Sequence, residues 1–299
     1  MGTILHAADA KDLTGLLARL DGEFIFSRGR RISLAQRFPE VYCPANLRNI
    51  LVLEAGGNIV SALATRPFLW SSDAVQYKGA MIGAVYTQPE HRGEGHAGRL
   101  LSWAAQRLRD DGLDFAVLWT TQPAIYASRG WHALDRGVLG ECTSAAYAAC
   151  SVGLEPSRCD AATWQRIEAI RRRWSNSWVL RDGEGYRQLP LPADSTTVLV
   201  AGDDVEQGAY ALAGRQDDCG FLYEMTGAPA GFPALWQQLQ LGFRRLLVND
   251  ATGSPSHRWL SRSHDLAWCA KPLALWLPLS DRIAPSCFGR WYIPYIDRI

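Results

Sequence analysis

Residues 85–101 read VYTQPEHRGEGHAGRLL, and this stretch decides how the first half of the chain folds. Its apolar start continues a strand that begins near residue 76, and glycines at 93, 95 and 98 let the backbone approach a ligand closely. From residue 97 to 109, apolar side chains recur at helical spacing. The first amides of a helix lack partners inside the helix and carry partial positive charge. A strand, a glycine-rich loop and a helix start therefore predict a phosphate site, with Arg92 at its edge.

The flanking segments place this loop in a mixed sheet. Two apolar runs at 50–54 and 59–63 enclose the turn residues GGN, which predicts a hairpin. Residues 115–119, FAVLW, predict a buried strand after the helix. Because strand, helix and strand follow one another, the strands near 85 and 117 are expected to be parallel. The predicted fold class is α/β, with a mixed sheet of the α+β kind.

The glycine-rich loop fits one family better than the common nucleotide motifs. It lacks the Gly-Lys-Ser/Thr of a Walker loop and the spacing of a Rossmann fingerprint. The pattern Arg92-x-x-Gly95-x-Ala97 resembles motif A of the GNAT superfamily of N-acetyltransferases. Downstream, Tyr126 precedes the pair Gly130-Trp131 by four residues, which is similar to the second motif of that family. The two motifs lie about 30 residues apart, with one helix and one strand between them.

This resemblance covers about residues 1–140 and implies a GNAT fold that moves an acetyl group from acetyl-CoA to a primary amine. It implies that pantetheine threads between splayed strands at 81–87 and 115–120, and that the loop holds the pyrophosphate. Tyr126 matches the general acid of the family, which protonates the departing thiolate; the alternative is a tyrosine that only packs under the pantetheine arm. The implied cofactor-binding residues are Val85, Tyr86, Thr87, Arg92, Gly93, Glu94, Gly95, His96, Ala97 and Gly98.

The general base and the acceptor stay open at this stage. Candidate bases are Glu23, Glu54, Glu141, the carboxylate of Ile299 and a water chain. His91 is expected to pack or touch the cofactor, and His132 to be structural. The acceptor is expected to be an amine of a small molecule or peptide. Two alternatives remain: a GNAT-fold sensor that binds acyl-CoA without turnover, and transfer of a longer acyl group.

The second half repeats the element order without the motif. Strands are expected near 196–201, 207–214, 219–226, 244–249, 265–271 and 273–279, with helices at 160–173 and 233–242. After the strand at 219–226 the chain reads TGAPAGFP, and its two prolines remove amide donors that a pyrophosphate loop needs. We therefore expect a catalytic domain at 1–145 and a degenerate GNAT-like domain at 146–299, joined by a crossing at 140–160. This layout resembles tandem GNAT enzymes such as the Eis-like acetyltransferases and mycothiol synthase.

Two further expectations concern the space between the halves. The last nine residues, WYIPYIDRI, are unusually apolar for a terminus and are expected to dock near the cleft. Pockets favour domain interfaces. The candidates for a wall of the acceptor site are Trp70, Trp174, Trp178 and Glu224.

The composition argues against several classes of binding partner. The chain has 31 Lys and Arg against 30 Asp and Glu, a net charge of +1, so a nucleic-acid partner is not expected. Its seven cysteines include no C-x-x-C pair, which argues against a metal site and suggests reduced thiols in a cytoplasmic protein. No apolar run approaches the ~20 residues that span a bilayer, so no membrane association is expected.

Overall fold

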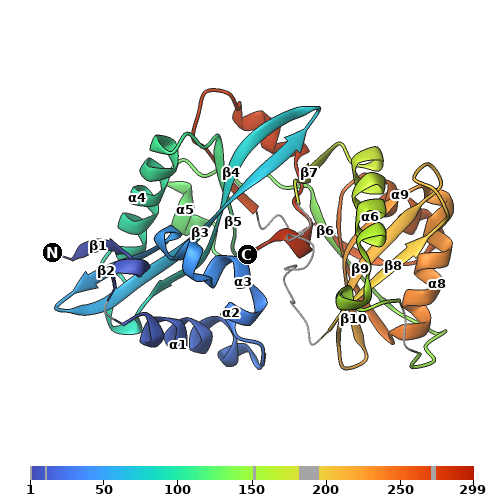
Figure 1. Ribbon diagram of the computed structural model, residues 1–299, viewed down its shortest axis with the longest axis horizontal. Helices are drawn as coiled ribbons and strands as arrows, with labels where there is room; N and C mark the ends of the chain where they lie inside the picture. Colours follow the sequence, from blue (N-terminus) through green and yellow to red (C-terminus); the bar gives the residue numbers. More distant parts are fainter. Residues whose placement is uncertain (1, 11, 151–152, 182–194, 271–273) are drawn as a thin grey trace.

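The computed structural model describes residues 2–10, 12–150, 153–181, 195–270 and 274–299. Figure 1 shows two α/β halves side by side, with the C-terminus between them at the centre of the molecule. The mixed α/β class predicted from the sequence is confirmed, because each half contains a sheet with both parallel and antiparallel neighbours.

The first sheet has the strand order β1-β2-β3-β4-β5-β13, and β7 pairs with the end of β3. Only β4 and β5 run parallel, as the strand–helix–strand order predicted; the other pairs are antiparallel. The predicted hairpin is formed by β2 and β3. The strands are β1 (Thr3–His6), β2 (Ile50–Ala55), β3 (Asn58–Ser72), β4 (Val75–Thr87), β5 (Phe115–Trp119), β7 (Ser177–Val179) and β13 (Ala274–Pro278).

Helices cover both faces of this sheet because strand side chains alternate in direction. Leu51 and Leu53 of β2 pack in one cluster with α4 (His96–Asp110), whereas Ile50 and Val52 pack in another with α1 (Leu13–Phe24). The Asp12 carboxylate caps α1 by accepting from the Gly15 N–H. Two short helices, α2 (Leu34–Arg37) and α3 (Pro39–Tyr42), follow α1 and lie beside the C-terminus in Figure 1.

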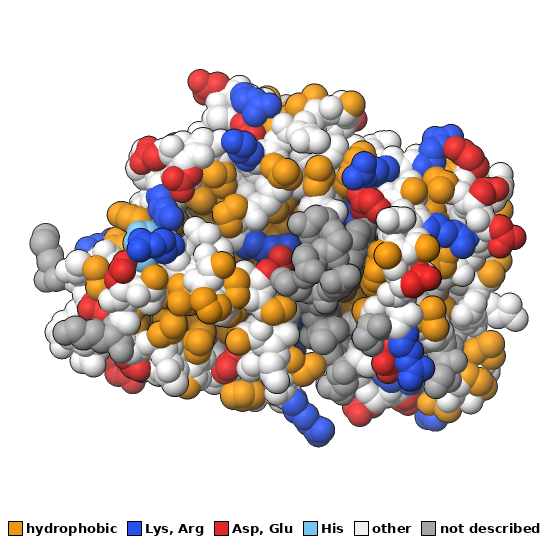
Figure 2. All heavy atoms as spheres, viewed as in Figure 1, with side chains coloured by type: hydrophobic (Ala, Val, Ile, Leu, Met, Phe, Trp, Pro, Cys, Tyr) orange, Lys and Arg blue, Asp and Glu red, His pale blue; other side chains and the backbone are white. Residues whose placement is uncertain are grey.

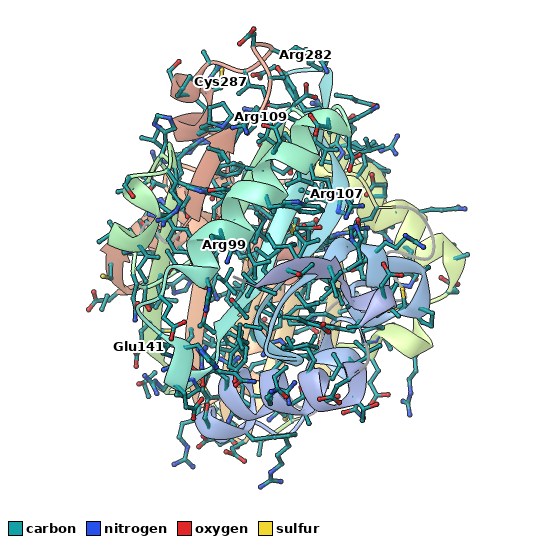
Figure 3. All side chains as sticks on the ribbon, turned by 90° about the vertical axis from the view of Figure 1, so that its left-hand side faces the viewer. Arg99, Arg107, Arg109, Glu141, Arg282 and Cys287 are labelled. Carbon is teal, nitrogen blue, oxygen red and sulfur yellow. The ribbon has the colours of Figure 1, made fainter. Side chains whose placement is uncertain are left out.

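The outer face of α4 is basic and is fastened to the N-terminal edge. Figure 3 shows Arg99, Arg107 and Arg109 along this helix. Arg99 donates to the carbonyl oxygen of Gly2 at 3.0 Å, and Arg107 donates to that of Arg48 at 2.6 Å. These bonds hold the first strand and the loop before β2 against the helix whose start forms the glycine-rich loop.

Strands β4 and β5 separate after a short stretch of pairing. The register runs from Gly79 opposite Phe115 to Met81 opposite Val117, whereas β4 continues to Thr87. A bulge lies at this point, with Ala84 at a φ of +48° and a register shift against β3. Bulges bend a strand away from its neighbour, and a positive φ at a residue other than glycine is strained. The bend opens a gap between the two parallel strands.

The second sheet has the order β12-β6-β11-β10-β9-β8 and again contains one parallel pair, β10 with β11. Helix α8 (Phe232–Gly242) packs on one face and α6 (Ala161–Trp174) on the other, with α9 (Pro255–Ser263) beside α8. The predicted strands and helices of this half are present, although residues 271–273 lie outside the described residues. The strands are β6 (Gly137–Thr143), β8 (Ser195–Ala201), β9 (Ala209–Gln216), β10 (Cys219–Gly227), β11 (Arg245–Ala251) and β12 (Ala267–Ala270).

The two halves exchange strands. Strand β6 comes from the range 1–145 but pairs with β11 in the second sheet, and β13 comes from 146–299 but pairs with β5 in the first. The expected crossing at 140–160 was therefore wrong for residues 140–143, because their backbone hydrogen bonds lie within the second sheet. Domains at 1–145 and 146–299 remain a proposal, and the sheets themselves do not follow that division.

An aromatic core locks the returning segment onto the first sheet. Trp276 of β13 stacks on Phe288, with ring centroids 5.3 Å apart, and Trp291 lies 5.1 Å from Phe115 of β5. Trp70 is fully buried in this core, 5.8 Å from Trp291. The expectation that Trp70 forms part of an acceptor wall was wrong, because its ring is enclosed by the segment that follows β13.

A buried ionic cluster then anchors the last residues; we call Arg171, Arg181, Glu224 and Asp297 the tail anchor. The Asp297 carboxylate accepts two hydrogen bonds from Arg181, both of 2.6 Å, and lies 3.9 Å from Arg171. Glu224 of β10 pairs with both arginines. From the first half, Arg66 donates to the main-chain oxygen of Asp297 at 3.1 Å. Both halves therefore hold the end of the chain.

We predict that Asp297→Asn lowers the free energy of unfolding by about 3–5 kcal/mol, because it leaves buried arginine charge uncompensated. Burial alone would raise the pKa of Asp297, but Arg181 and Arg171 outweigh it and hold that pKa below its usual range. The stabilisation is therefore fully present above the unfolded value of about 3.9 and is lost as the pH falls from that value through the lower folded pKa. Urea unfolding at pH 7 and near pH 2 measures both effects.

The matched control is Glu206→Gln, which removes an exposed partner of Arg173. Exposed pairs contribute little, so this variant should unfold like the wild type at both pH values. Equal behaviour of the two variants would show that the tail anchor does not stabilise the fold.

Candidate functional site

The separated ends of β4 and β5 both line a cavity of about 920 Å³. Its walls come from the bulged end of β4, the glycine-rich loop, the start of α4, the end of β5, the short helix α5 (Ala124–Ala127) and the last residues of the chain. We call this cavity the cleft. Nine of the ten predicted cofactor-binding residues line it: Val85, Tyr86, Thr87, Arg92, Gly93, Gly95, His96, Ala97 and Gly98.

The glycine-rich loop is open toward the cleft. Gly93 and Gly95 have φ values of +89° and +79°, which favour glycine. A Cβ built on either one meets no described atom within 4 Å. Gly95 immediately precedes α4 and has no side chain to cap it. The first amides of α4 are therefore available to an anionic ligand.

Ion pairs surround the same loop. Arg92 donates to the Thr87 carbonyl oxygen and to Glu23, each at 3.1 Å. Glu94 does not line the cleft, but its carboxylate lies 3.4 Å from His91 and 3.0 Å from His96, which both line it.

Sequence reasoning missed the grouping of His91, Glu94 and His96. Their ligand atoms lie within 4.8 Å of one another and could hold a metal ion. The signal was three potential ligands within six residues, which a search for cysteine pairs overlooks. Glu94 contacts one nitrogen of each imidazole, while the buried Nδ1 of His96 has no hydrogen-bond partner among the described residues.

Tyr126 lies in α5 and lines the cleft. Its ring packs edge-on against Trp131, with centroids 6.1 Å apart, and only 7% of the residue is exposed. Burial raises the pKa of Tyr126, while Arg129 opposes the shift. A phenol in this setting keeps its proton at neutral pH and can donate it to a more basic atom.

The structure separates the candidate bases. Glu23 lines the cleft but is paired with Arg92, and Ile299 lines it from the end of the chain. The main-chain carbon of Ile299 lies 3.3 Å from the position of a Cβ built on Gly83, beside the bulge of β4. Glu54 and Glu141 do not line the cleft, and Glu141 pairs with Arg245 in the second sheet. His132 exchanges main-chain hydrogen bonds with Trp276, so its place is structural, as expected.

A second cavity, of about 520 Å³, lies between the halves where β10 and β11 end. Trp174, Trp178 and Glu224, three of the four candidates for the acceptor wall, line this cavity rather than the cleft. These three residues come from different helices and strands, so the sequence did not show that they line the same cavity.

The turn after β10 is closed, unlike the loop after β4. A Cβ built on Gly227 would lie 2.3 Å from the Ala209 backbone, and one on Gly231 would lie 2.7 Å from the Ala209 Cβ. The turn thus packs directly onto β9, and prolines occupy positions 229 and 233. This leaves little room for a phosphate at the start of α8.

Comparisons with known proteins agree with these features. Residues 8–134 match the family model of an acetyltransferase (GNAT) domain. No curated protein sequence matches the chain.

In the part of the chain that the structure describes, no helix is both long and apolar enough to cross a membrane.

Solved structures share the fold over most of the chain. A GCN5-related N-acetyltransferase from Anabaena variabilis superposes with a TM-score of 0.69 and 12% identity, covering 93% of this chain and 73% of that one. Eis1 from Mycobacterium abscessus gives 0.60 and 14%, covering 93% and 74%. Saccharomyces cerevisiae N-myristoyltransferase with bound myristoyl-CoA gives 0.56 and 10%, covering 91% and 84%. The chain therefore carries a GNAT acetyltransferase domain at residues 8–134, within a two-sheet fold shared with solved GNAT proteins.

Proposed function

We propose that the protein is an N-acetyltransferase that moves the acetyl group of acetyl-CoA to a primary amine of a small molecule or peptide. The observation that carries this proposal is the cleft itself, which combines an open loop at the uncapped start of α4 with Tyr126 in one cavity. The match of residues 8–134 to a GNAT domain supports an acyl transfer.

In this proposal acetyl-CoA lies along the unpaired end of β4. The loop from Arg92 to Gly98 holds the pyrophosphate, with Glu94 shaping the loop through its two histidines. Residues 82–87 of β4 have no partner on β5, so their main-chain groups can bind the pantetheine arm as another strand would. A main-chain N–H near Thr87 stabilises the charge that develops on the thioester oxygen.

The chemistry is a direct attack. The amine nitrogen forms a bond to the thioester carbon, the carbon–sulfur bond breaks, and the thiolate leaves with the proton of Tyr126. Holding amine and thioester together makes the step effectively intramolecular. A phenol with an unperturbed pKa of about 10 is protonated at neutral pH and can donate to a thiolate of similar basicity. Burial raises the pKa of Tyr126, which keeps the proton in place but makes the phenol a weaker acid.

The base that deprotonates the amine is proposed to be a water chain in the cleft. Of the three candidate glutamates only Glu23 lines the cleft, and its carboxylate is paired with Arg92. The first half supplies the cofactor site and the second half contributes Arg181 and Glu224 to the tail anchor, which fits a catalytic domain at 1–145 with a degenerate partner at 146–299. The described cysteines are all free thiols, which suits the proposed cytoplasmic location.

Gly95→Asp is expected to abolish coenzyme A binding, because a carboxylate would repel the pyrophosphate at close range. Gly95→Asn is the matched control, since it has the same shape and the same tolerance of a positive φ without the charge. Calorimetry should show about one coenzyme A per chain for the wild type, a moderate loss for Asn and no binding for Asp. Unchanged affinity in the Asp variant, or two equivalent sites in the wild type, would contradict the assignment of the loop.

Tyr126→Phe should lower the rate of acetyl transfer by about 10²–10⁴-fold, the range for one acid–base group. Cofactor affinity should change only a few-fold, because the ring that packs on Trp131 is retained. Single-turnover transfer is the right measurement, since slow product release can hide a loss in the steady state. A rate within threefold of wild type would leave Tyr126 with a packing role, and cofactor binding without thiol release for any amine would favour the sensor.

Glu23→Gln should keep the same single-turnover rate within about threefold of wild type, because the Glu23 carboxylate is paired with Arg92 and does not act as the base. A loss of about 100-fold or more would make Glu23 the base. Acetyl-CoA and longer acyl-CoA donors should be compared in the same assay, which shows whether the protein transfers an acetyl group or a longer acyl group.

A further inference from the structure

Four arginines without carboxylate partners line one region of the cleft. Arg28, Arg30 and Arg37 come from the segment before α3, and Arg298 comes from the tail. Among the described residues, no carboxylate forms an ion pair with any of these four. Elsewhere the molecule mixes its charges, and Figure 2 shows acidic and basic side chains interspersed over the face it draws. The cleft is therefore a local excess of positive charge on a nearly neutral protein.

Arg37 is the most unusual member of this group. It is only 7% exposed, its Nε atom has no hydrogen-bond partner, and its guanidinium lies 5.1 Å from the ring of Phe38. Burial lowers the pKa of Arg37 and Arg30 lowers it further, while Tyr295 opposes the shift. A buried charge without a counter-ion is costly, and an anion arriving beside it relieves that cost.

The helix that carries Arg37 is fastened at its start. Ser33 and Gln36 form a capping box at the start of α2, and the Leu34 N–H donates to Asp21 of α1 at 2.7 Å. Arg37 ends this helix and faces Tyr295, which lies four residues before Ile299. A rigidly placed guanidinium can bind an anion with little loss of conformational entropy.

We propose that the acceptor amine carries an anionic group, a carboxylate or a phosphate, which binds Arg37 with help from Arg30 and Arg298. This inference rests on the proposed acetyl transfer. The anion enters beside α2 and Tyr295, and the amine reaches the thioester near Ile299 and the bulge of β4. Arg92 and Arg129 lie at the glycine-rich loop instead, where the cofactor phosphates are expected.

Two pairs of amines test this proposal: β-alanine against β-alaninamide, and phosphoethanolamine against ethanolamine. Calorimetry on the coenzyme A-loaded protein gives their affinities, and thiol release from acetyl-CoA gives their rates. We expect the acidic member of at least one pair to bind about tenfold more tightly or better, as charge-assisted hydrogen bonds allow. A preference within the β-alanine pair indicates a carboxylate, and a preference within the phosphoethanolamine pair indicates a phosphate.

Arg37→Gln should bring the affinity ratio close to one, while the affinities for the neutral amine and for coenzyme A stay unchanged. Arg30→Gln, which changes an exposed side chain that also lines the cleft, should reduce the ratio a few-fold without threatening the fold. Arg31→Gln is the matched control, because Arg31 is exposed and does not line the cleft.

Equal or unmeasurable affinities for both members of each pair would overturn the inference, even if thiol release from neutral amines supports the acetyl transfer. Loss of coenzyme A affinity in Arg37→Gln would also overturn it, because the arginine would then serve the cofactor. A preference for the acidic member without thiol release for any amine would support anion recognition while the proposed transfer fails.

Discussion

Strands β4 and β5 pair through only three residues before β4 bends away, and every feature of the cleft depends on this separation. Parallel neighbours normally satisfy each other's main-chain groups, so two strands that part leave an unpaired edge inside the protein. The bulge at Ala84 maintains the bend at some cost in backbone strain. The same bend places the glycine-rich loop, the start of α4 and Tyr126 around one opening.

The exchange of strands supplies the other wall of that opening. With β6 in the second sheet, the free edge of β5 is filled by β13, and the chain after β13 must return across the first half. The aromatic core around Trp291 and the tail anchor around Asp297 then direct the last residues into the cleft. The second half, whose turn after β10 leaves little room for a phosphate, thus helps to shape the cleft of the first half.

Charge in the cleft is divided between two regions. The helix start and Arg92 form the region suited to phosphates, and Arg37, Arg30 and Arg298 form a second region near the tail. Among the described residues, Arg92 has an ion-pair partner in Glu23, whereas Arg37 has none. A buried guanidinium without a carboxylate partner is costly, and the proposed anionic group of the acceptor would relieve that cost.

The sequence by itself determined the local elements and the position of the glycine-rich loop. Turn glycines, apolar periodicity and a helix start are local signals, so the hairpin, the parallel pair and the loop at 92–98 were predictable from neighbouring residues. Pairings between residues far apart were not. Trp70 lies in the core rather than in a pocket. Strands β6 and β13 each pair in the sheet of the other half. Arg37 lies beside Tyr295, which is more than 250 residues away in the sequence. Only the tertiary structure decided these, because edge-strand pairing and buried charge depend on which distant surfaces pack together.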